Sequence, residues 1–211
     1  MLTKALCLIM FAMFAASLPT AAQTSTHASP VGMRFDDPTF GVSFQYPAKW
    51  TSSAASPFMF KLTVNDPDSR QHPRAMIFKK TLAGVEGWPK TNFAGVEFGY
   101  DVHQVDSADA CRTLASKATR QNTIDQVTVG GIRYWHTKTG DGGMSQALDE
   151  DIYTTLNGAT RGDCFRFDTG IHSNLMAGNR PPRAPNSPEG DLIRESLWNI
   201  LASVHLSTPT R

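Results

Sequence analysis

The chain has little net charge, few cysteines and no long apolar run after its N-terminus, and each shortage excludes a class of protein. Its 20 lysine and arginine residues nearly balance 19 aspartate and glutamate residues, for a formal charge of +1. Proteins that bind nucleic acid or anionic membranes select a basic surface, so the composition argues against both partners. Because no second apolar segment of membrane length follows, we predict no transmembrane span in the mature protein.

The N-terminus has the three parts of a secretory signal peptide. Lys4 supplies the positive charge, residues 5–18 the apolar segment, and Thr20 and Ala22 the small residues before the cleavage site. The apolar segment is shorter than the ~20 residues of a transmembrane helix, which disfavours the alternative of an uncleaved anchor. We predict a signal peptide at residues 1–22 and an exported protein, either periplasmic or extracellular. Its removal takes away Lys4 and leaves equal numbers of basic and acidic residues.

Cysteine is scarce in a way that fits this compartment. Cys7 leaves with the signal peptide, and the mature chain keeps Cys111 and Cys164. A single pair in an oxidising compartment usually forms one structural disulfide. This bond would close a loop of about 53 residues and contribute roughly 4 kcal/mol. The alternative, a redox-active pair, usually has close spacing such as Cys-x-x-Cys, which is absent here.

Periodic apolar patterns predict one α+β domain with a mainly antiparallel sheet. Alternating or apolar runs bounded by turn residues predict strands, in chain order at 33–36, 40–47, 58–64, 75–80, 98–105, 125–129, 132–138, 145–156 and 162–172. We expect the strand at 58–64 to pair with that at 75–80, and an irregular connection with a short helical turn to precede 98–105. Residues 140–143 predict a wide loop.

Two helices complete the predicted domain. The first begins at Asp106 or Ser107, either of which suits an N-cap, and runs to about Lys117. The second begins near Pro188 and packs on the sheet, because apolar residues recur in it at helical spacing and Trp198 widens that face. The predicted layout is a flexible leader at 23–32, a single globular domain at 33–206 and a tail at 207–211.

Two segments resemble the ends of PsbP-like domains. Residues 40–50, which read Phe-Gly-Val-Ser-Phe-Gln-Tyr-Pro-Ala-Lys-Trp, resemble the opening Gly-Φ-Ser-Φ-x-Tyr-Pro-x-x-Trp strand, where Φ is apolar. Residues 197–206 resemble the closing helix with its Ile-x-x-Ser-Φ-x-Φ tail. The resemblance implies an α/β/α sandwich around a central antiparallel sheet, in exported non-enzymatic proteins that bind or assist other proteins. The photosystem role of the plant members is not carried over, because fold alone does not define function.

Candidate catalytic and metal-binding residues have weak patterns. Residues 143–147 are similar to a Gly-x-Ser-x-Gly nucleophile turn around Ser145, but they enter a strand where that motif requires a helix. A zinc site would need ligands from separate strands, and His136 and His172 are the pair on candidate sheet strands. We predict no catalytic residue, no metal and no cofactor. The mature chain has six histidines: His27, His72, His103, His136, His172 and His205.

Three other groups have an ordinary structural interpretation. On a strand, Asp149 and Asp151 share one face and Glu150 takes the other, and we expect such adjacent acids to stay solvated, without the loop spacing of a calcium site. Arg180 and Arg183 predict a solvated loop, with a docking surface as the alternative. The aromatic set predicts core in preference to a ligand groove: Phe40, Phe44, Tyr46, Trp50, Phe58 and Phe60.

The sequence leaves three hypotheses for function. The first is an exported non-enzymatic domain that binds a protein or a small ligand of the cell envelope. The second is a hydrolase, which requires a nucleophile, a histidine and a carboxylate within hydrogen-bond reach in a cleft. The third is a carrier of hydrophobic ligands, which requires a roomy apolar cavity between the sheet and the helix.

Overall fold

A computed structural model describes residues 32–58, 61–62, 73–80, 93–116, 123–142, 146–157, 162–174 and 188–207. The predicted signal peptide, the leader up to Val31, Ser145 and the loop of Arg180 and Arg183 lie outside these ranges, as do Phe60, His27 and His72. Within the ranges, no helix is long and apolar enough to cross a membrane. The elements in chain order are β1 (Gly32–Asp37), β2 (Val42–Pro47), β3 (Thr51–Ser53), β4 (Ala75–Lys80), β5 (Phe93–Val105), α1 (Ala108–Ser116), β6 (Asp125–Val129), β7 (Ile132–Gly142), β8 (Gln146–Asn157), β9 (Gly162–Asn174), α2 (Pro188–Ala202) and β10 (His205–Leu206).

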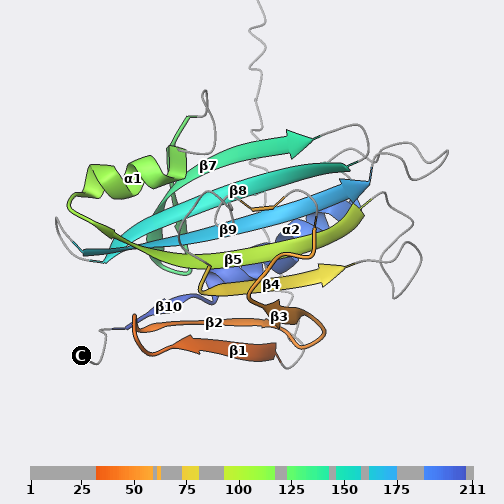
Figure 1. Cartoon of the computed structure of the whole chain (residues 1–211), viewed down its shortest axis with the longest axis horizontal. Coiled ribbons are helices and arrows are strands. Elements are labelled where there is room, and N and C mark those ends of the chain that lie inside the picture. Colours follow the sequence, from red (N-terminus) through yellow and green to blue (C-terminus); the bar gives the residue numbers. More distant parts are fainter. Residues whose placement is uncertain are drawn as a thin grey trace, which may run out of the picture.

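The strands form two antiparallel sheets. The large sheet has seven strands in the order β3-β4-β5-β9-β8-β7-β6, and the small sheet has the order β1-β2-β10. Helix α2 passes behind β5 and β9, and the small sheet lies next to β3 and β4, at one end of the large sheet (Figure 1). The predicted α+β class, with a mainly antiparallel sheet and a C-terminal helix, is therefore confirmed, although the strands divide between two sheets.

One face of the large sheet carries the main core. Side chains alternate along a strand, so Phe98 and Tyr100 of β5 share this face with Phe167 of β9. Their rings contact one another and Phe44 of the small sheet, with centroids 5.1 Å apart for Phe44 and Phe98 and 5.3 Å for Tyr100 and Phe167. Helix α2 covers the rest of the face with a buried apolar stripe of Ile193, Leu197, Ile200 and Leu201. The helical spacing predicted from the sequence is confirmed.

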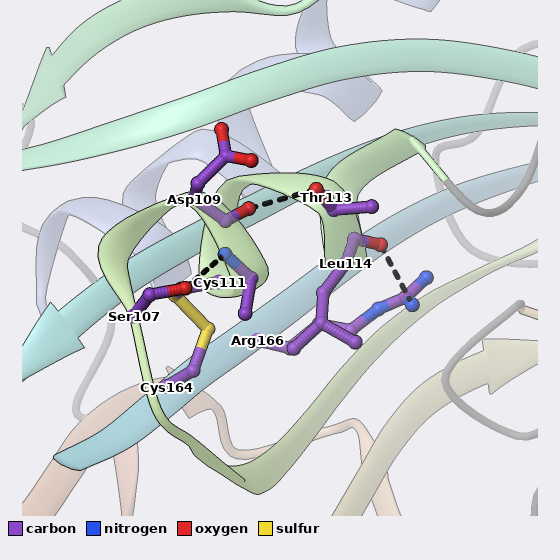
Figure 2. The surroundings of a disulfide bond; sticks show 8 residues. Ser107, Asp109, Cys111, Thr113, Leu114, Cys164 and Arg166 are labelled. Carbon is purple, nitrogen blue, oxygen red and sulfur yellow. Dashed lines mark hydrogen bonds between the residues drawn. A yellow bond between two sulfur atoms is a disulfide. The ribbon is translucent and has the colours of Figure 1, made fainter. Parts of the chain in front are cut away.

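The opposite face of the large sheet is charged and lies under α1 at one end. The predicted disulfide is confirmed: Cys111 of α1 is bonded to Cys164 of β9, with the two Cα atoms 5.5 Å apart. The amide N–H of Ala110 donates to Ser107 Oγ at 3.1 Å, so Ser107 is the N-cap. Figure 2 shows the disulfide and, further along α1, Arg166 donating to the carbonyl oxygen of Leu114. Helix α1 is thus attached to β9 at two points.

Several predicted boundaries are wrong. Strand β4 pairs with β3 and β5 and not with the segment at 58–64, whose described residues Phe58, Lys61 and Leu62 lie in no strand. Strand β5 already begins at Phe93, so Gly95 lies within the strand and does not end it. The ring of Phe58 occupies the space that a Cβ at Gly95 would need, which explains the glycine. Strand β7 continues to Gly142, through the predicted loop.

The predicted ends of the domain also shift. Strand β1 already includes Gly32, which the sequence analysis places in the leader. The tail does not begin at Ser207, because the amide and the hydroxyl of Ser207 both donate to the carbonyl oxygen of Gly41, at 2.8 and 3.0 Å. These bonds join the C-terminal end of the described chain to the start of β2.

Candidate functional site

A cleft of about 670 Å³ opens between α2 and the strands β7, β8 and β9. This volume is in the range of small-molecule sites, which are concave and combine apolar walls with a few polar groups. We call it the His136 cleft. It is lined by His136, Lys138, Thr139, Asp149, Glu150, Asp151, Tyr153, Thr169, Ile171, Arg194, Glu195, Leu197, Trp198 and Leu201.

The sheet side of the cleft holds a fixed histidine–carboxylate pair. His136 Nε2 lies 2.8 Å from Asp151 Oδ1, and Lys138 Nζ lies 3.6 Å from the same oxygen. Because a carboxylate only accepts hydrogen bonds, Nε2 carries the proton and donates it. The His136 ring also stacks on Tyr153, with centroids 4.7 Å apart and planes inclined by 22°. These contacts hold the imidazole in one orientation.

The register of β7 and β8 explains why these groups meet. His136 is paired with Tyr153 and Lys138 with Asp151, so the four side chains project from the same face of two neighbouring strands. This is the face that carries α2 and the aromatic core. Burial, and secondarily the charge of Asp151, raise the pKa of the Tyr153 hydroxyl, so this group stays protonated and uncharged.

The helix side of the cleft is apolar and ends in an exposed indole. Leu197 and Leu201 of α2 face Ile171 of β9 across the cleft, and all three are buried. Trp198 is 45% exposed, and Met33 is the other large hydrophobic residue that is exposed among those the structure describes. The prediction that Trp198 widens the buried stripe is wrong, because α2 turns that side chain to the cleft and solvent. Tryptophan is enriched at binding interfaces, because its large ring gives apolar contact while its N–H can donate a hydrogen bond.

The charged groups of the cleft have both signs. Lys138 and Arg194 are positive, and Asp149, Asp151 and Glu195 are negative. Arg194 is also bonded to Asp191, one helical turn earlier, at 3.1 Å. Such a lining offers hydrogen-bond donors and acceptors together, which favours a polar or zwitterionic group over a simple ion.

The structure separates the two histidines that the sequence analysis pairs as possible metal ligands. His172 lies on the other face of the sheet, where its Nε2 is 3.1 Å from Glu97 Oε2 and its ring stacks on Phe58 at 3.8 Å. His136 lies opposite Tyr153 of β8, and Tyr153 lies opposite Phe167 of β9. The odd-numbered residues of β9 therefore share the face of His136, and the even-numbered His172 projects from the other face. The described part of the chain contains no group of three or more histidine, cysteine or acidic residues able to hold a metal ion.

The acidic run is placed as predicted, with one correction. Asp149 and Asp151 share the cleft face with Tyr153, and Glu150 projects to the opposite face. Glu150 is 4% exposed and not solvated. The expectation failed for Glu150 because β8 is an inner strand of the large sheet and its face away from the cleft is covered at this position, whereas Asp149 on the cleft face is exposed.

The aromatic set belongs mainly to the core, and none of its described members lines the His136 cleft. Phe44, Tyr46 and Trp50 belong to the main core, as predicted. Phe40 lies under the guanidinium of Arg74, 4.5 Å from its ring centroid. The residues that sequence reasoning missed are Lys138, Arg194 and Trp198. The sequence offered one signal for these residues, which is the spacing of four between Arg194 and Trp198 on one predicted helix. That spacing does not show which strands the helix covers.

The fold is a two-sheet α+β sandwich, and a cleft of the size of small-molecule sites lies beside its C-terminal helix. No family model matches the sequence, and no curated protein is similar to it in sequence. Similar solved structures include cyanobacterial PsbP from Synechocystis (13% identity, TM-score 0.42, 90% of this chain and 99% of that chain) and LpqN from Mycobacterium tuberculosis, described as involved in cell envelope biogenesis (12% identity, TM-score 0.43, 86% and 88%). A protein from Bacteroides thetaiotaomicron is also similar (9% identity, TM-score 0.47, 85% of this chain), and this chain spans 50% of its length. The solved structures that are similar to this chain therefore include a PsbP structure, and the sequence had also shown a resemblance to PsbP-like domains.

Proposed function

We propose that this protein is an exported, non-catalytic domain that binds a small ligand in the His136 cleft. The observation that carries the proposal is the lining of the cleft: a fixed polar wall of His136, Tyr153 and Asp151 faces an apolar wall that ends in the exposed indole of Trp198. A matching ligand has an apolar or aromatic surface and carries both hydrogen-bond donors and acceptors.

Export is supported by two observations on this chain. The N-terminus has the three parts of a signal peptide. The bond between Cys111 and Cys164 is of the kind that persists in oxidising compartments such as the periplasm or the extracellular space. Partners and ligands of the cell envelope are therefore the ones available to the cleft.

A binding role fits the histidine–carboxylate pair better than a hydrolytic one. A hydrolase of the serine or cysteine type needs a hydroxyl or thiol group bonded to the histidine. In the described residues, the hydrogen bond of His136 is made to Asp151, and its ring is covered by Tyr153. This geometry holds the imidazole as a rigid wall, which reduces the entropic cost of binding.

The mixed polar and apolar lining also limits the kind of ligand that a carrier of hydrophobic molecules could hold in this cleft. A cavity does lie between the sheet and the helix, as that hypothesis requires. A pure hydrocarbon ligand would displace water from the polar wall of the cleft and offer it no hydrogen bonds in return. The loss of hydration would oppose binding. The cleft therefore fits an amphipathic ligand.

The test is native mass spectrometry of the full protein recovered from the compartment to which it is exported. We expect a bound small molecule in the wild type and at least about a tenfold loss of occupancy in Trp198→Ala, because a packed aromatic contact often contributes a large share of the binding energy. Met33→Ala is the matched control, because Met33 is similarly exposed but lies on β1, away from the cleft. Absence of a bound molecule from the wild type, or the same loss in both variants, would contradict the proposal.

The hydrolytic alternative has a separate readout. The variant His136→Asn keeps a polar planar side chain but removes a general base. If the recovered protein hydrolyses ester or amide substrates and this variant alone loses the activity, the cleft is catalytic and the non-catalytic part of the proposal fails.

A further inference from the structure

The small sheet ends in a strand whose outer edge has no partner among the described residues. In the order β1-β2-β10, strand β1 pairs on one side only, and it lies at the lower border of the described elements in Figure 1. Unpaired edges attract other strands, so proteins shorten them or interrupt them with proline or a bulge. The other edge strands that the structure describes are shorter, with three residues in β3, five in β6 and two in β10. Strand β1 has six residues in unbroken register with β2, and none is a proline.

The backbone groups on this outer edge belong to Arg34 and Asp36. The amide and the carbonyl oxygen of Gln45 both bond to the hydroxyl of Ser203, at 2.8 and 3.2 Å, so they point away from β1. Gln45 lies opposite Arg34 in the pairing of β1 with β2. Residues that lie opposite each other in an antiparallel pair point their backbone groups either toward each other or both away. The N–H and C=O groups of Arg34, and of Asp36 two residues on, therefore point outward, where an additional strand would pair.

The order of charges along β1 selects a second copy of this strand as the partner. The side chains of Arg34 and Asp36 project to the solvent face and are 60% and 56% exposed. Because outward backbone groups recur at every second residue, an antiparallel partner can shift only in steps of two residues. With Phe35 opposite the partner's Phe35, each arginine lies opposite the partner's aspartate. The two neighbouring registers place Arg34 opposite the partner's Arg34, or Asp36 opposite the partner's Asp36, and like charges in these positions repel.

The ion pair within one chain does not have to open for this pairing. Arg34 donates from Nε to the carboxylate of Asp36 at 2.8 Å and from Nη2 to the hydroxyl of Ser43 at 3.1 Å. Its Nη1 makes no bond within the described residues, and each carboxylate oxygen of Asp36 can accept a further hydrogen bond. An isolated exposed ion pair contributes little to stability, so the added contacts extend it into a network of four charges.

The other face of β1 leaves apolar surface that the same register covers. Phe35 stacks on Phe44 of the core, with centroids 4.8 Å apart, but it is only partly buried. Met33, the next residue on this face, is 51% exposed. In the register centred on Phe35, the two Phe35 rings form a pair without backbone bonds between them, the position in which facing side chains come closest. The aromatic core of each chain then continues into that of the other.

We propose that two copies of this chain associate through β1, paired antiparallel about Phe35. The two three-stranded small sheets form one continuous sheet with a two-fold axis at its centre. One strand edge buries less than the roughly 1,200 Å² of a standard interface, so the dimer is weak and reversible. The inference goes beyond the proposed function, because no residue of β1 lines the His136 cleft. Failure of either proposal leaves the other untouched.

The test is sedimentation velocity of the full mature protein at rising concentrations up to about 1 mM, because a weak dimer forms only near its Kd. We expect a monomer at low concentration and a dimer at high concentration. Arg34→Asp and Asp36→Arg each give a strand with two like charges and should raise the Kd at least about tenfold. An equimolar mixture of the two variants should recover a dimer at least as tight as the wild type, because opposite charges again face each other.

Two further variants keep the result interpretable. Arg34→Pro removes an N–H that β1 does not use in its pairing with β2, so the monomer should stay folded by circular dichroism while the dimer is lost. Arg133→Asp is the matched control, because it reverses the same charge at an exposed position on β7 of the large sheet. The proposal is overturned by a monomer at every concentration or by a mixture of Arg34→Asp and Asp36→Arg that associates no better than either alone. A dimer that persists in Arg34→Pro, or an equal loss in Arg133→Asp, overturns it as well.

Discussion

The two faces of the large sheet are both buried, but they are filled by opposite kinds of side chain. The face under α2 holds the aromatic core, and the His136 cleft opens from it. The opposite face carries charged residues with almost no solvent contact, among them Arg166 at 4% and Asp168 at 0% exposure. Deeply buried charge therefore marks structure in this molecule, whereas half-exposed charge marks the candidate sites.

The buried charges are held by one another. The guanidinium of Arg166 donates two hydrogen bonds to the carboxylate of Asp168, both at 2.8 Å. It donates a third to the carbonyl oxygen of Leu114 at 3.3 Å, which Figure 2 shows. Burial lowers the pKa of Arg166, but the charge and hydrogen bonds of Asp168 outweigh it and raise that pKa overall. With its donors engaged, Arg166 fixes α1 on the sheet and is not available to a ligand.

The largest expected effect breaks this ion pair. Arg166→Met should lower the free energy of unfolding by about 5 kcal/mol, at the upper end for a broken buried pair, because Asp168, Glu150 and Asp101 lose their shared cation. Denaturant unfolding at neutral pH measures this loss. The double variant Arg166→Met, Asp168→Leu should recover most of the stability, since no charge is left unpaired. Equal stability of the two variants would show that the pair is not the cause.

The second effect concerns the covalent attachment of the charged face. Replacing Cys111 and Cys164 by serine should cost about 4 kcal/mol, because the bond closes a loop with a sequence separation of 53 residues in the unfolded chain. Reduction of the wild type should reproduce the loss, whereas the ligand affinity of the folded variant should not change, because α1 lies on the face away from the His136 cleft. A loss below about 1 kcal/mol in both experiments would mean that α1 is held mainly by packing.

The third prediction concerns the pH dependence of stability that Asp101 gives to the charged face. Burial raises the pKa of Asp101 to about 6, in spite of the amide of Val102 and the positive charge of Arg166. Between about pH 4 and 6 the folded protein therefore keeps a proton that the unfolded chain has lost, so the contribution of Asp101 to stability falls as the pH rises, by up to about 1.4 kcal/mol per unit. The stability of Asp101→Asn relative to the wild type should improve from pH 4 to pH 7. A constant difference over this range would contradict the raised pKa.

The smallest effect lies on the apolar face. The hydroxyl of Tyr134 is buried and has no hydrogen-bond partner among the described residues, whereas the hydroxyl of Tyr100 donates to Asp37 at 3.5 Å. Tyr134→Phe should therefore raise the free energy of unfolding by about 1 kcal/mol, because an unsatisfied polar group is removed. Tyr100→Phe, the matched control, should lower it or leave it unchanged. Destabilisation by Tyr134→Phe would show that a partner satisfies this hydroxyl.

Much of the local structure follows from the sequence, because it depends on short-range patterns. The helical spacing of Ile193, Leu197 and Ile200 identifies α2, and two cysteines in an exported chain permit one bond. The alternation that places Asp149 and Asp151 on one face is equally local. These predictions needed no knowledge of what packs against each element.

The sites could not be predicted in the same way, because they depend on long-range placement. His136 meets Asp151 only through the register of β7 and β8, and the cleft exists only because α2 lies across β9 at a particular position. His172 and Glu97 are 75 residues apart, and nothing local indicates that they pair.

The most direct test of the His136 cleft as a binding site is crystallographic screening with a library of uncharged aromatic fragments. We predict that the fragments collect between Trp198 and the stacked pair of His136 and Tyr153. A His136 cleft that stays empty of fragments while they bind elsewhere on the molecule would contradict the account.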